Sequence, residues 1–392
     1  MSVRAALISG PMYDPLYARL ASFTRDTGIA VDVAFMGDHP ALNSHLALWV
    51  DQPGEVPYDL VSTHSKYFPS QLPLLAPLDE LLDGRELDDF VPLLLDMVRL
   101  AGRVYGLPRN IDVRLLHYRT DLLAAAPVTW DALLEEARRV NQPPQVYGFL
   151  FPGKESGLFG TFYELAEMGG ARLFPPDLVP QIENDGGRWA LHFLRTCYQE
   201  GLLPPALVDW HFDRVHDFFR DGCAALVGDW PGYYADYLNP ITSHVHDRFA
   251  LARYPAGPAG RHLAYGGGHT FALTGRGARS PEALALLRFL SAPEQQLLEA
   301  RNGSVPVRRS VMRQVQAEST SREKARWELL ERVISEDVLI PPKFASYPRV
   351  EEVLWVTVQA AMTGRVPVDE ALRDMTRRIE AIVKEPGRSH GE

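Results

Sequence analysis

An extended segment in the first third of the chain passes directly into a capped helix. Residues 105–123 (YGLPRNIDVRLLHYRTDLL) are predicted to form a strand that leaves one globular unit. Pro127 and Thr129 then mark the start of a helix, with Thr129 as the N-cap and Asp131 in the first turn. A strand that crosses between two domains can act as a hinge, and hinged proteins of two lobes trap ligands between the lobes.

The N-terminal part predicts a parallel sheet with helices on both faces. The chain has 392 residues, which is too many for one compact core and suits two or three domains. Strands alternate with helices in this part, which is typical of such sheets. The expected strands are 3–9, 29–36 and 58–62, and the expected helices are about 14–27 and 40–50. Ligands of these sheets lie beyond the carboxyl ends of the strands, here the loops 10–14, 37–39 and 63–67.

The rest of the chain returns to strand–helix character after a long helical stretch. Residues 117–245 and 322–383 are expected to be mostly helical, with strands near 224–228, 249–254 and 270–274. Ser280 and Pro281 start a further helix. We therefore predict an α/β protein of two discontinuous lobes. The predicted boundaries are 1–110 plus 266–312 for lobe one, 115–260 plus 313–392 for lobe two, and hinges near 111–114 and 260–266.

Composition excludes several classes of protein. Apolar residues make up 46% and charged residues 23%, as in ordinary globular proteins, and the net charge of −10 disfavours nucleic acid and anionic lipid as partners. The longest apolar runs stay below 18 residues, so no direct membrane insertion is expected. Residues 1–10 predict a buried strand rather than a secretory signal, so the protein is either cytoplasmic or preceded by a leader that is removed. Cys197 and Cys223 predict two buried free thiols.

Four segments, in this order, resemble a known family. The stretch 219–230 (FRDGCAALVGDW) is similar to the pattern F-x-x-G-x-A-A-M-x-x-x-G-x-W of the extracellular solute-binding proteins of ABC importers, in the carbohydrate-binding, maltose-binding group. The other matching segments are 106–131, 254–257 with 266–269, and 292–296 with 303–308. The chain departs from the family in lacking a leader with a lipid-bearing Cys. It also reads HYRTDLL at 117–123, where the family usually has YNKDLL.

The resemblance implies a two-lobed periplasmic-binding-protein fold of type II. It also implies high-affinity binding of a small carbohydrate or sugar derivative between lobes that close on it, and delivery to the membrane permease of an ABC transporter. A periplasmic or extracellular location after removal of a leader, a monomer, no cofactor and no enzymatic activity follow from the same resemblance. The arginines near the expected cleft leave room for an anionic sugar.

The crossing strand offers the first candidate ligand contacts. Asp112 and Arg114 alternate with apolar residues, so they share one face of a strand. A carboxylate accepts hydrogen bonds from sugar hydroxyls, and an Arg donates to ring or anionic oxygens. The family places an acidic residue at the position of Asp112. Asn110 is the neighbouring candidate, and a salt bridge between lobes is the alternative role for the charged pair.

Aromatic and small residues complete the predicted site. Trp230, in the loop sequence GDWPG, is expected to stack on a sugar ring, with Asp229 and Tyr233 beside it. Gly268 allows a close backbone approach to the ligand or hinge freedom. Further candidates follow expected strand ends or lie where the family presents contacts, with packing or capping as the alternative for each: Tyr13, His64, Ser65, His269, Gly157, Phe159 and Tyr347. Asp14 is expected to cap the first helix.

Catalytic and metal motifs are weak in this sequence. The spacing of the histidines does not predict a zinc site, and the chain has neither a Gly-x-Ser-x-Gly elbow nor a phosphate-binding Gly-x-x-x-x-Gly-Lys loop. The alternative to a binding protein is a glycoside-processing enzyme that uses two of the carboxylates of Asp112, Asp229 and Glu155.

Overall fold

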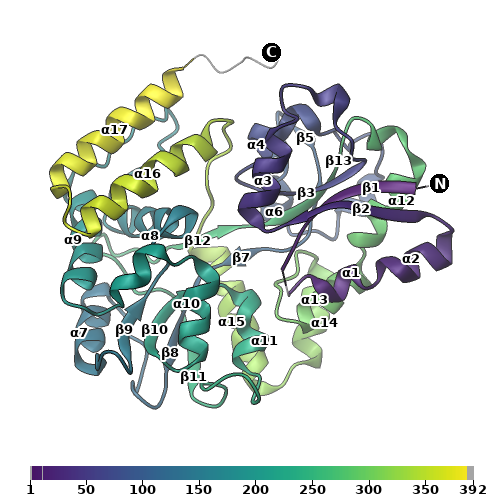
Figure 1. Ribbon diagram of the computed structural model, residues 1–392. Helices are drawn as coiled ribbons and strands as arrows, with labels where there is room; N and C mark the ends of the chain where they lie inside the picture. Colours follow the sequence, from purple (N-terminus) through teal and green to yellow (C-terminus); the bar gives the residue numbers. More distant parts are fainter. Residues whose placement is uncertain (1, 11, 386–392) are drawn as a thin grey trace.

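The computed structural model describes residues 2–10 and 12–385 and shows two α/β lobes side by side (Figure 1). Lobe one contains a five-stranded sheet of order β2-β1-β3-β13-β6, and lobe two a four-stranded sheet of order β11-β8-β10-β9. The predicted two-lobed α/β fold is confirmed. The lobe boundaries stay a prediction, and residues 1, 11 and 386–392 of the predicted ranges lie outside the described part.

The sheet of lobe one is covered on both faces. Its strands are β1 (Ser2–Ile8), β2 (Ala30–Gly37), β3 (Leu60–His64), β6 (Leu107–Pro108) and β13 (His269–Leu273). The first three are parallel, as predicted, whereas β13 runs antiparallel to β3 and β6 antiparallel to β13. Along β1, Val3 and Leu7 pack into one hydrophobic cluster and Ala6 and Ile8 into another. Alternate residues of one strand thus serve two cores.

Short helices surround this sheet. They are α1 (Asp14–Tyr17), α2 (Leu20–Thr27), α3 (His39–Ala47), α4 (Phe68–Gln71), α5 (Gly84–Leu87), α6 (Pro92–Asp96), α12 (Pro281–Leu290) and α13 (Pro293–Arg301), with the hairpin β4 (Arg99–Leu100) and β5 (Arg103–Val104). The prediction of one helix over 14–27 was wrong, because the segment forms two helices, with Ala18 and Arg19 between them. The expected cap at Asp14 was also wrong. Tyr13 occupies the N-cap position and its side chain makes no capping bond.

Lobe two surrounds a mixed sheet with longer helices. Its strands are β8 (Leu115–Arg119), β9 (Tyr147–Leu150), β10 (Ala224–Asp229) and β11 (Phe249–Ala252), and its helices are α7 (Trp130–Val140), α8 (Glu155–Met168), α9 (Asp185–Gln199), α10 (Phe212–Arg220), α11 (Tyr234–Tyr237), α16 (Tyr347–Met362) and α17 (Val368–Lys384). The predicted cap is present, since Thr129 Oγ1 accepts the Ala132 N–H at 3.1 Å. Ser280 caps α12 in the same way. Strand β9 was missed within the region predicted to be mostly helical.

A third sheet lies between the two large ones (Figure 1). Its strands are β7 (Asp112–Val113), β12 (Ala264–Gly267) and β14 (Val338–Leu339). Strand β12 pairs antiparallel with β7 and parallel with β14. The predicted long strand is therefore interrupted, and its pieces β6, β7 and β8 belong to three different sheets. The pairing of β7 with β12 falls where hinges were predicted, and the crossing at β14 was not predicted. The remaining helices, α14 (Arg309–Glu318) and α15 (Ser321–Glu336), follow one another, and α15 packs on β7 and β14.

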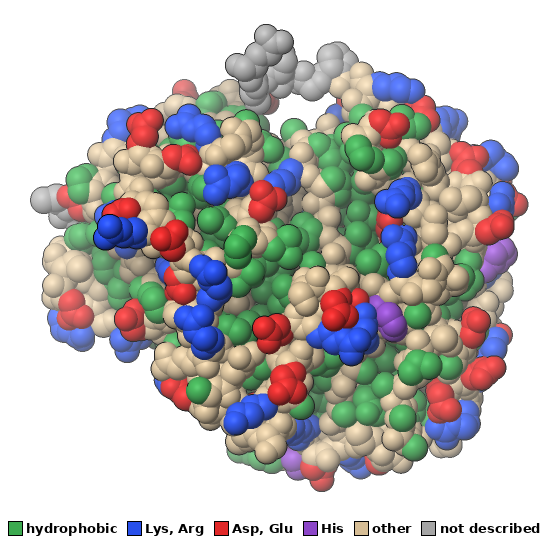
Figure 2. All heavy atoms as spheres, turned by 180° about the vertical axis from the view of Figure 1, so that it is seen from behind, with side chains coloured by type: hydrophobic (Ala, Val, Ile, Leu, Met, Phe, Trp, Pro, Cys, Tyr) green, Lys and Arg blue, Asp and Glu red, His purple; other side chains and the backbone are tan. Residues whose placement is uncertain are grey.

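The remaining sequence expectations concern surface and thiols. Figure 2 shows basic, acidic and apolar side chains mixed over the rear face, without a continuous basic area among its coloured residues. Cys197 and Cys223 are both free, as predicted, but only Cys197 is fully buried. Among residues 2–10 and 12–385, no helix is both long enough and apolar enough to span a bilayer.

Candidate ligand-binding site between the lobes

Strand ends bring several polar side chains together at one edge of the lobe one sheet. Parallel strands β2 and β3 end there, and antiparallel β13 begins there. His39 is the first residue of α3, two positions after the end of β2, and His64 and His269 are register partners in the β3–β13 pair. Tyr13 approaches His269 edge-on, with 5.7 Å between the ring centres. Three of the predicted ligand contacts, Tyr13, His64 and His269, are therefore neighbours.

The histidines at this edge are neutral imidazoles at neutral pH. Burial lowers the pKa of His39 and His64 well below the ordinary range and that of His269 to about 3. Neighbouring positive groups, including Lys66, lower these pKa values further. A neutral imidazole carries one donor and one acceptor, so each ring can serve a hydroxyl group in either direction.

Asp112 is a carboxyl group without a cationic hydrogen-bond partner among the described residues. Its Oδ2 accepts the Asn110 side-chain amide at 2.8 Å, and the Asn110 Oδ1 accepts the His269 backbone N–H at 3.0 Å. Burial raises the pKa of Asp112 to about 7, against the lowering effect of the Asn110 bond and of Arg109. The carboxyl group is therefore available to a ligand either as an acceptor or, when protonated, as a donor.

Arg109 packs against the aromatic rings of Tyr13 and Tyr17 in lobe one. Its guanidinium lies 4.0 Å from the ring centre of Tyr13, and its Nη1 donates to the Tyr17 hydroxyl at 2.8 Å. The same guanidinium is paired with the buried carboxylate of Glu299, from Nε to Oε1 at 2.9 Å. The charge of Arg109 is thus balanced inside the lobe.

Trp230 is the predicted aromatic ligand contact of lobe two. It follows β10 and is partly buried, with Phe212 at 5.2 Å and Tyr265 at 6.4 Å between ring centres. The Arg114 guanidinium lies 5.5 Å from the Trp230 ring and is paired with the buried Glu164 at 3.0 Å. Arg114 therefore points into lobe two, and its Nε is buried without a hydrogen-bond partner. The Asp112 carboxyl group, in contrast, accepts its hydrogen bond from Asn110 at the edge of the lobe one sheet.

Asp229 is engaged inside lobe two. Its carboxylate accepts the Trp230 backbone N–H at 2.8 Å and the Tyr237 hydroxyl, and lies 3.3 Å from His216 Nδ1. Tyr233 stacks on His216 with 3.9 Å between ring centres. These contacts favour a role for Asp229 in positioning Trp230 over direct contact with a ligand.

An ion pair joins the two lobes beside this region. Lys66 Nζ, just after β3, lies 2.9 Å from both carboxylate oxygens of Glu351 on α16, and the Tyr67 hydroxyl donates to Glu351 at 3.3 Å. The side chains of Lys66 and Glu351 are only 4% and 6% exposed. A Cβ added to Gly232 of lobe two would lie 3.6 Å from Met12 Cε of lobe one. The described structure is therefore closed at this boundary.

The other predicted contacts serve packing or backbone bonds. Ser65 exchanges hydrogen bonds with Gly268, and a Cβ on Gly268 would lie 2.4 Å from the Asn110 carbonyl oxygen. Phe159 and Tyr347 are fully buried and pack 6.1 Å apart in the core of lobe two. These contacts favour structural roles. A Cβ on Gly157 would likewise lie 2.4 Å from Pro152 Cβ, so the glycine permits a close approach.

Several residues of this region were not singled out from the sequence. His39 and Lys66 lie in loops that were expected at strand ends, which was the available signal. Glu351 lies one helical turn after Tyr347, and Tyr265 directly precedes the glycine run. Nothing in the local sequence indicates that Glu351 meets Lys66, because 285 positions separate them.

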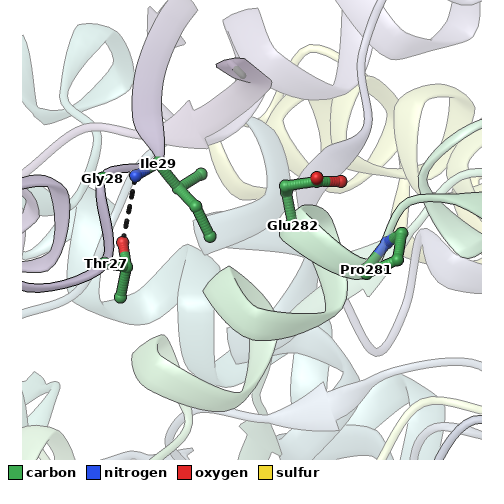
Figure 3. A pocket seen from close by; sticks show the side chains of 5 residues that line it. All are labelled: Thr27, Gly28, Ile29, Pro281 and Glu282. Carbon is green, nitrogen blue, oxygen red and sulfur yellow. Dashed lines mark hydrogen bonds between the residues drawn. The ribbon is translucent and has the colours of Figure 1, made fainter.

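A surface depression of about 250 Å³ lies elsewhere. It is lined by Thr27, Gly28, Ile29, Pro281 and Glu282 (Figure 3), and the Ile29 N–H donates to Thr27 Oγ1 at 3.2 Å. These residues precede β2 and begin α12, so the depression lies at the amino end of β2. Ligands of parallel sheets bind at the opposite, carboxyl end.

Comparison with known proteins places this arrangement in a family. Residues 12–297 match the family described as bacterial extracellular solute-binding protein. A probable ABC transporter-binding protein of Deinococcus radiodurans is 26% identical over 59% of this chain, and the match spans 57% of that protein's own length. A probable amino-acid ABC transporter periplasmic-binding protein of Sinorhizobium fredii is 22% identical over 98% of this chain and 90% of its own length.

A solved structure has the same fold over almost the whole chain. Maltose-bound MalE3 of T. maritima superimposes with a TM-score of 0.88 and 25% identity, covering 97% of this chain and 99% of that one. The likeness extends over both lobes and the sheet between them.

Proposed function

Because this chain belongs to the bacterial extracellular solute-binding proteins, we propose that it binds a neutral carbohydrate or polyol between its lobes and delivers it to an ABC transporter. The observation that carries this proposal is the balance of charge around an aromatic and polar site. Aromatic side chains of both lobes lie among groups that can exchange hydrogen bonds with hydroxyls, and the nearby cations are paired with carboxylates.

The paired cations favour a ligand without ionised groups. Lys66 is paired with Glu351, Arg109 with Glu299 and Arg114 with Glu164, all buried. An amino acid, a sugar acid or a sugar phosphate would need a cation of its own, because a buried charge without a partner is strongly unfavourable. This argument weighs against an amino acid, the ligand named for the Sinorhizobium relative, and against the anionic sugar that the arginines suggested.

Hydroxyl-rich ligands fit the remaining groups. Trp230 and Tyr13 offer ring faces for the apolar C–H surface of a sugar. Asp112 and Asn110 offer acceptors and donors for its hydroxyls, and the imidazoles of His64 and His269 can add more. The solved structure with the same fold was obtained with maltose. We therefore place mono- or oligosaccharides and sugar alcohols first among candidate ligands.

The binding free energy of such a ligand is large enough to close the lobes. Binding with a micromolar Kd releases about 8 kcal/mol. Moving an equilibrium from about 1% to about 99% closed needs about 5.5 kcal/mol of differential affinity. The β7–β12 pair would act as the hinge. A periplasmic or extracellular location, a monomeric state and docking of the closed form on the permease belong to the same proposal.

A glycosidase is the rival function. The raised pKa of Asp112 suits a general acid, which is the one observation in its favour. Hydrolysis also needs a second free carboxylate. Asp229 already accepts two hydrogen bonds within lobe two, and Glu155 is ion-paired with Lys154 at 3.2 Å. Release of free sugar over many turnovers from maltose or aryl glycosides would favour the enzyme.

A ligand screen tests the proposal. Thermal shifts followed by calorimetry would compare maltose, glucose and mannitol with glucose 6-phosphate, glucuronate and glutamate. We expect one or more neutral members to raise the melting temperature and to bind one to one without turnover. Binding limited to glutamate or to the anionic sugars would contradict the proposal, as would the absence of any hit among neutral sugars and polyols.

A further inference from the structure

Three histidines of lobe one meet in a cluster that sugar binding alone does not explain. We name His39, His64 and His269 the histidine triad. Each offers one ring nitrogen, and these nitrogens lie within 4.8 Å of one another. We propose that the histidine triad binds a divalent transition-metal ion such as Zn²⁺. This inference goes beyond the proposed function, since it requires no sugar.

The rings are arranged as a metal centre with three histidines requires. In a tetrahedral zinc site with Zn–N bonds of about 2.0–2.1 Å, ring centres lie about 5 Å apart and ligand nitrogens about 3.4 Å apart. The observed ring centres are 4.8, 4.9 and 5.4 Å apart, and the rings are inclined to one another at 62–73°. The nitrogens need to approach by at most about 1.4 Å, which small side-chain rotations provide.

The triad has unused donor atoms. His39 Nε2 is buried and has no hydrogen-bond partner. Among the hydrogen bonds within residues 2–10 and 12–385, none involves the ring of His269. His64 Nδ1 lies 3.3 Å from the Lys66 backbone N–H, a long and therefore weak contact. A buried nitrogen without a partner is costly, and a metal ion would satisfy it.

The backbone holds the three side chains in register. Directly opposed residues of an antiparallel pair project side by side, and His64 and His269 are such partners. Asp38 caps α3 by accepting the Ala41 N–H at 2.9 Å, which fixes the start of the helix and with it His39. A Cβ on Gly267 would lie 2.5 Å from His64 Cε1, so the absence of a side chain there makes room for the imidazole.

The charge near the triad does not exclude a cation. Outside the triad, Lys66 lowers the pKa of all three imidazoles, and Arg109 lowers that of His269. Each is neutralised by its own glutamate, at 2.9 Å in both pairs.

The chemistry of three imidazoles selects the class of metal. Neutral nitrogen ligands suit Zn²⁺, Cu²⁺ and Ni²⁺, whereas Mg²⁺ and Ca²⁺ require oxygen ligands. Three protein ligands leave one tetrahedral position for water or a ligand oxygen, as in open zinc sites. Sequence spacing could not predict this site, because the three histidines come from separate strand ends.

Calorimetric titration with ZnCl₂, after treatment with a chelator and removal of any affinity tag, tests the inference. We expect one Zn²⁺ per wild-type chain. His39→Ala and His269→Ala should each weaken binding about 100-fold or more, since losing even an outer partner of a metal ligand costs 10–100-fold. His39→Cys should retain binding, because thiolate is also a zinc ligand. The matched control is His45→Gln, which removes an imidazole of the same lobe that stacks on Phe35.

Two further measurements keep the inference falsifiable. Circular dichroism verifies that each variant folds. Co²⁺ substitution should give the visible absorption of a tetrahedral site in wild type, His45→Gln and His39→Cys, but not in His39→Ala or His269→Ala. The inference would be overturned by absence of Zn²⁺ binding to the wild type, or by wild-type Zn²⁺ affinity in His39→Ala and His269→Ala. A loss of sugar affinity in the triad variants without Zn²⁺ binding by the wild type would identify hydrogen-bonding residues instead and leave the proposed function intact.

Discussion

The ion pair between Lys66 and Glu351 should contribute directly to ligand affinity. It joins lobe one to lobe two, and both side chains are almost fully buried in the closed structure. In an open form the two groups would face water. Replacing one partner, as in Glu351→Gln, therefore leaves a buried charge without a partner only in the closed form. Breaking a buried pair in this way typically costs about 3–5 kcal/mol.

This cost falls on binding rather than on folding. A tenfold change in Kd corresponds to about 1.4 kcal/mol of binding free energy. Either Glu351→Gln or Lys66→Met should therefore raise the Kd of the ligand about 100- to 4,000-fold. The melting temperature without ligand should change little. The double variant Lys66→Met/Glu351→Leu should recover most of the affinity, because an apolar pair is often as favourable as a buried ion pair.

Calorimetry with the neutral ligand identified in the screen measures these effects. The matched control is Glu318→Gln, which removes an ion pair with Arg301 on the surface. The Arg301 side chain is 58% exposed and that of Glu318 44%. Exposed pairs contribute only about 0–1 kcal/mol. A Kd within threefold of wild type for both single variants would refute the reasoning.

Three other perturbations test individual parts of the site. Trp230→Ala should weaken ligand binding by about 1.5–3 kcal/mol, measured by calorimetry, whereas Trp189→Ala in the same lobe should leave the Kd unchanged. Asp112 has a raised pKa in the folded protein, so its contribution to stability is greatest at acid pH and is lost as pH rises to about 7. Between about pH 4 and 7, the melting temperature of the wild type should therefore fall more than that of Asp112→Asn. Melting temperatures that change with pH in parallel in the two proteins would contradict this. Asp229→Asn should lower the free energy of unfolding by about 1–3 kcal/mol in denaturant titrations, since it weakens the acceptor of a buried hydroxyl. An unchanged stability would contradict its structural role.

Local patterns explain why much of the fold could be predicted. The caps at Thr129 and Ser280 depend on residues three positions apart and are present. Strands near 224–228 and 270–274 are short apolar runs with clear ends, and they are present too. Strand β9 has only four residues, Tyr147–Leu150, and a short apolar run cannot be told from a helical segment by periodicity.

The candidate site was less accessible to sequence reasoning. Loops after strands indicated Tyr13 and His64, because the carboxyl ends of parallel strands share one edge. Sequence cannot distinguish an aromatic residue of a ligand site from one of the core, and Phe159 and Tyr347 pack inside lobe two. The contact of Lys66 with Glu351 depends on how the lobes meet, which no local pattern encodes.

Small-angle scattering in the presence and absence of ligand tests the central claim most directly. If two lobes close on a solute at the β7–β12 crossing, adding the neutral sugar or polyol that binds in calorimetry should reduce the radius of gyration of wild type. The same addition should have less effect on Glu351→Gln, in which the closed form is destabilised. An unchanged radius of gyration in wild type at saturating ligand would contradict closure.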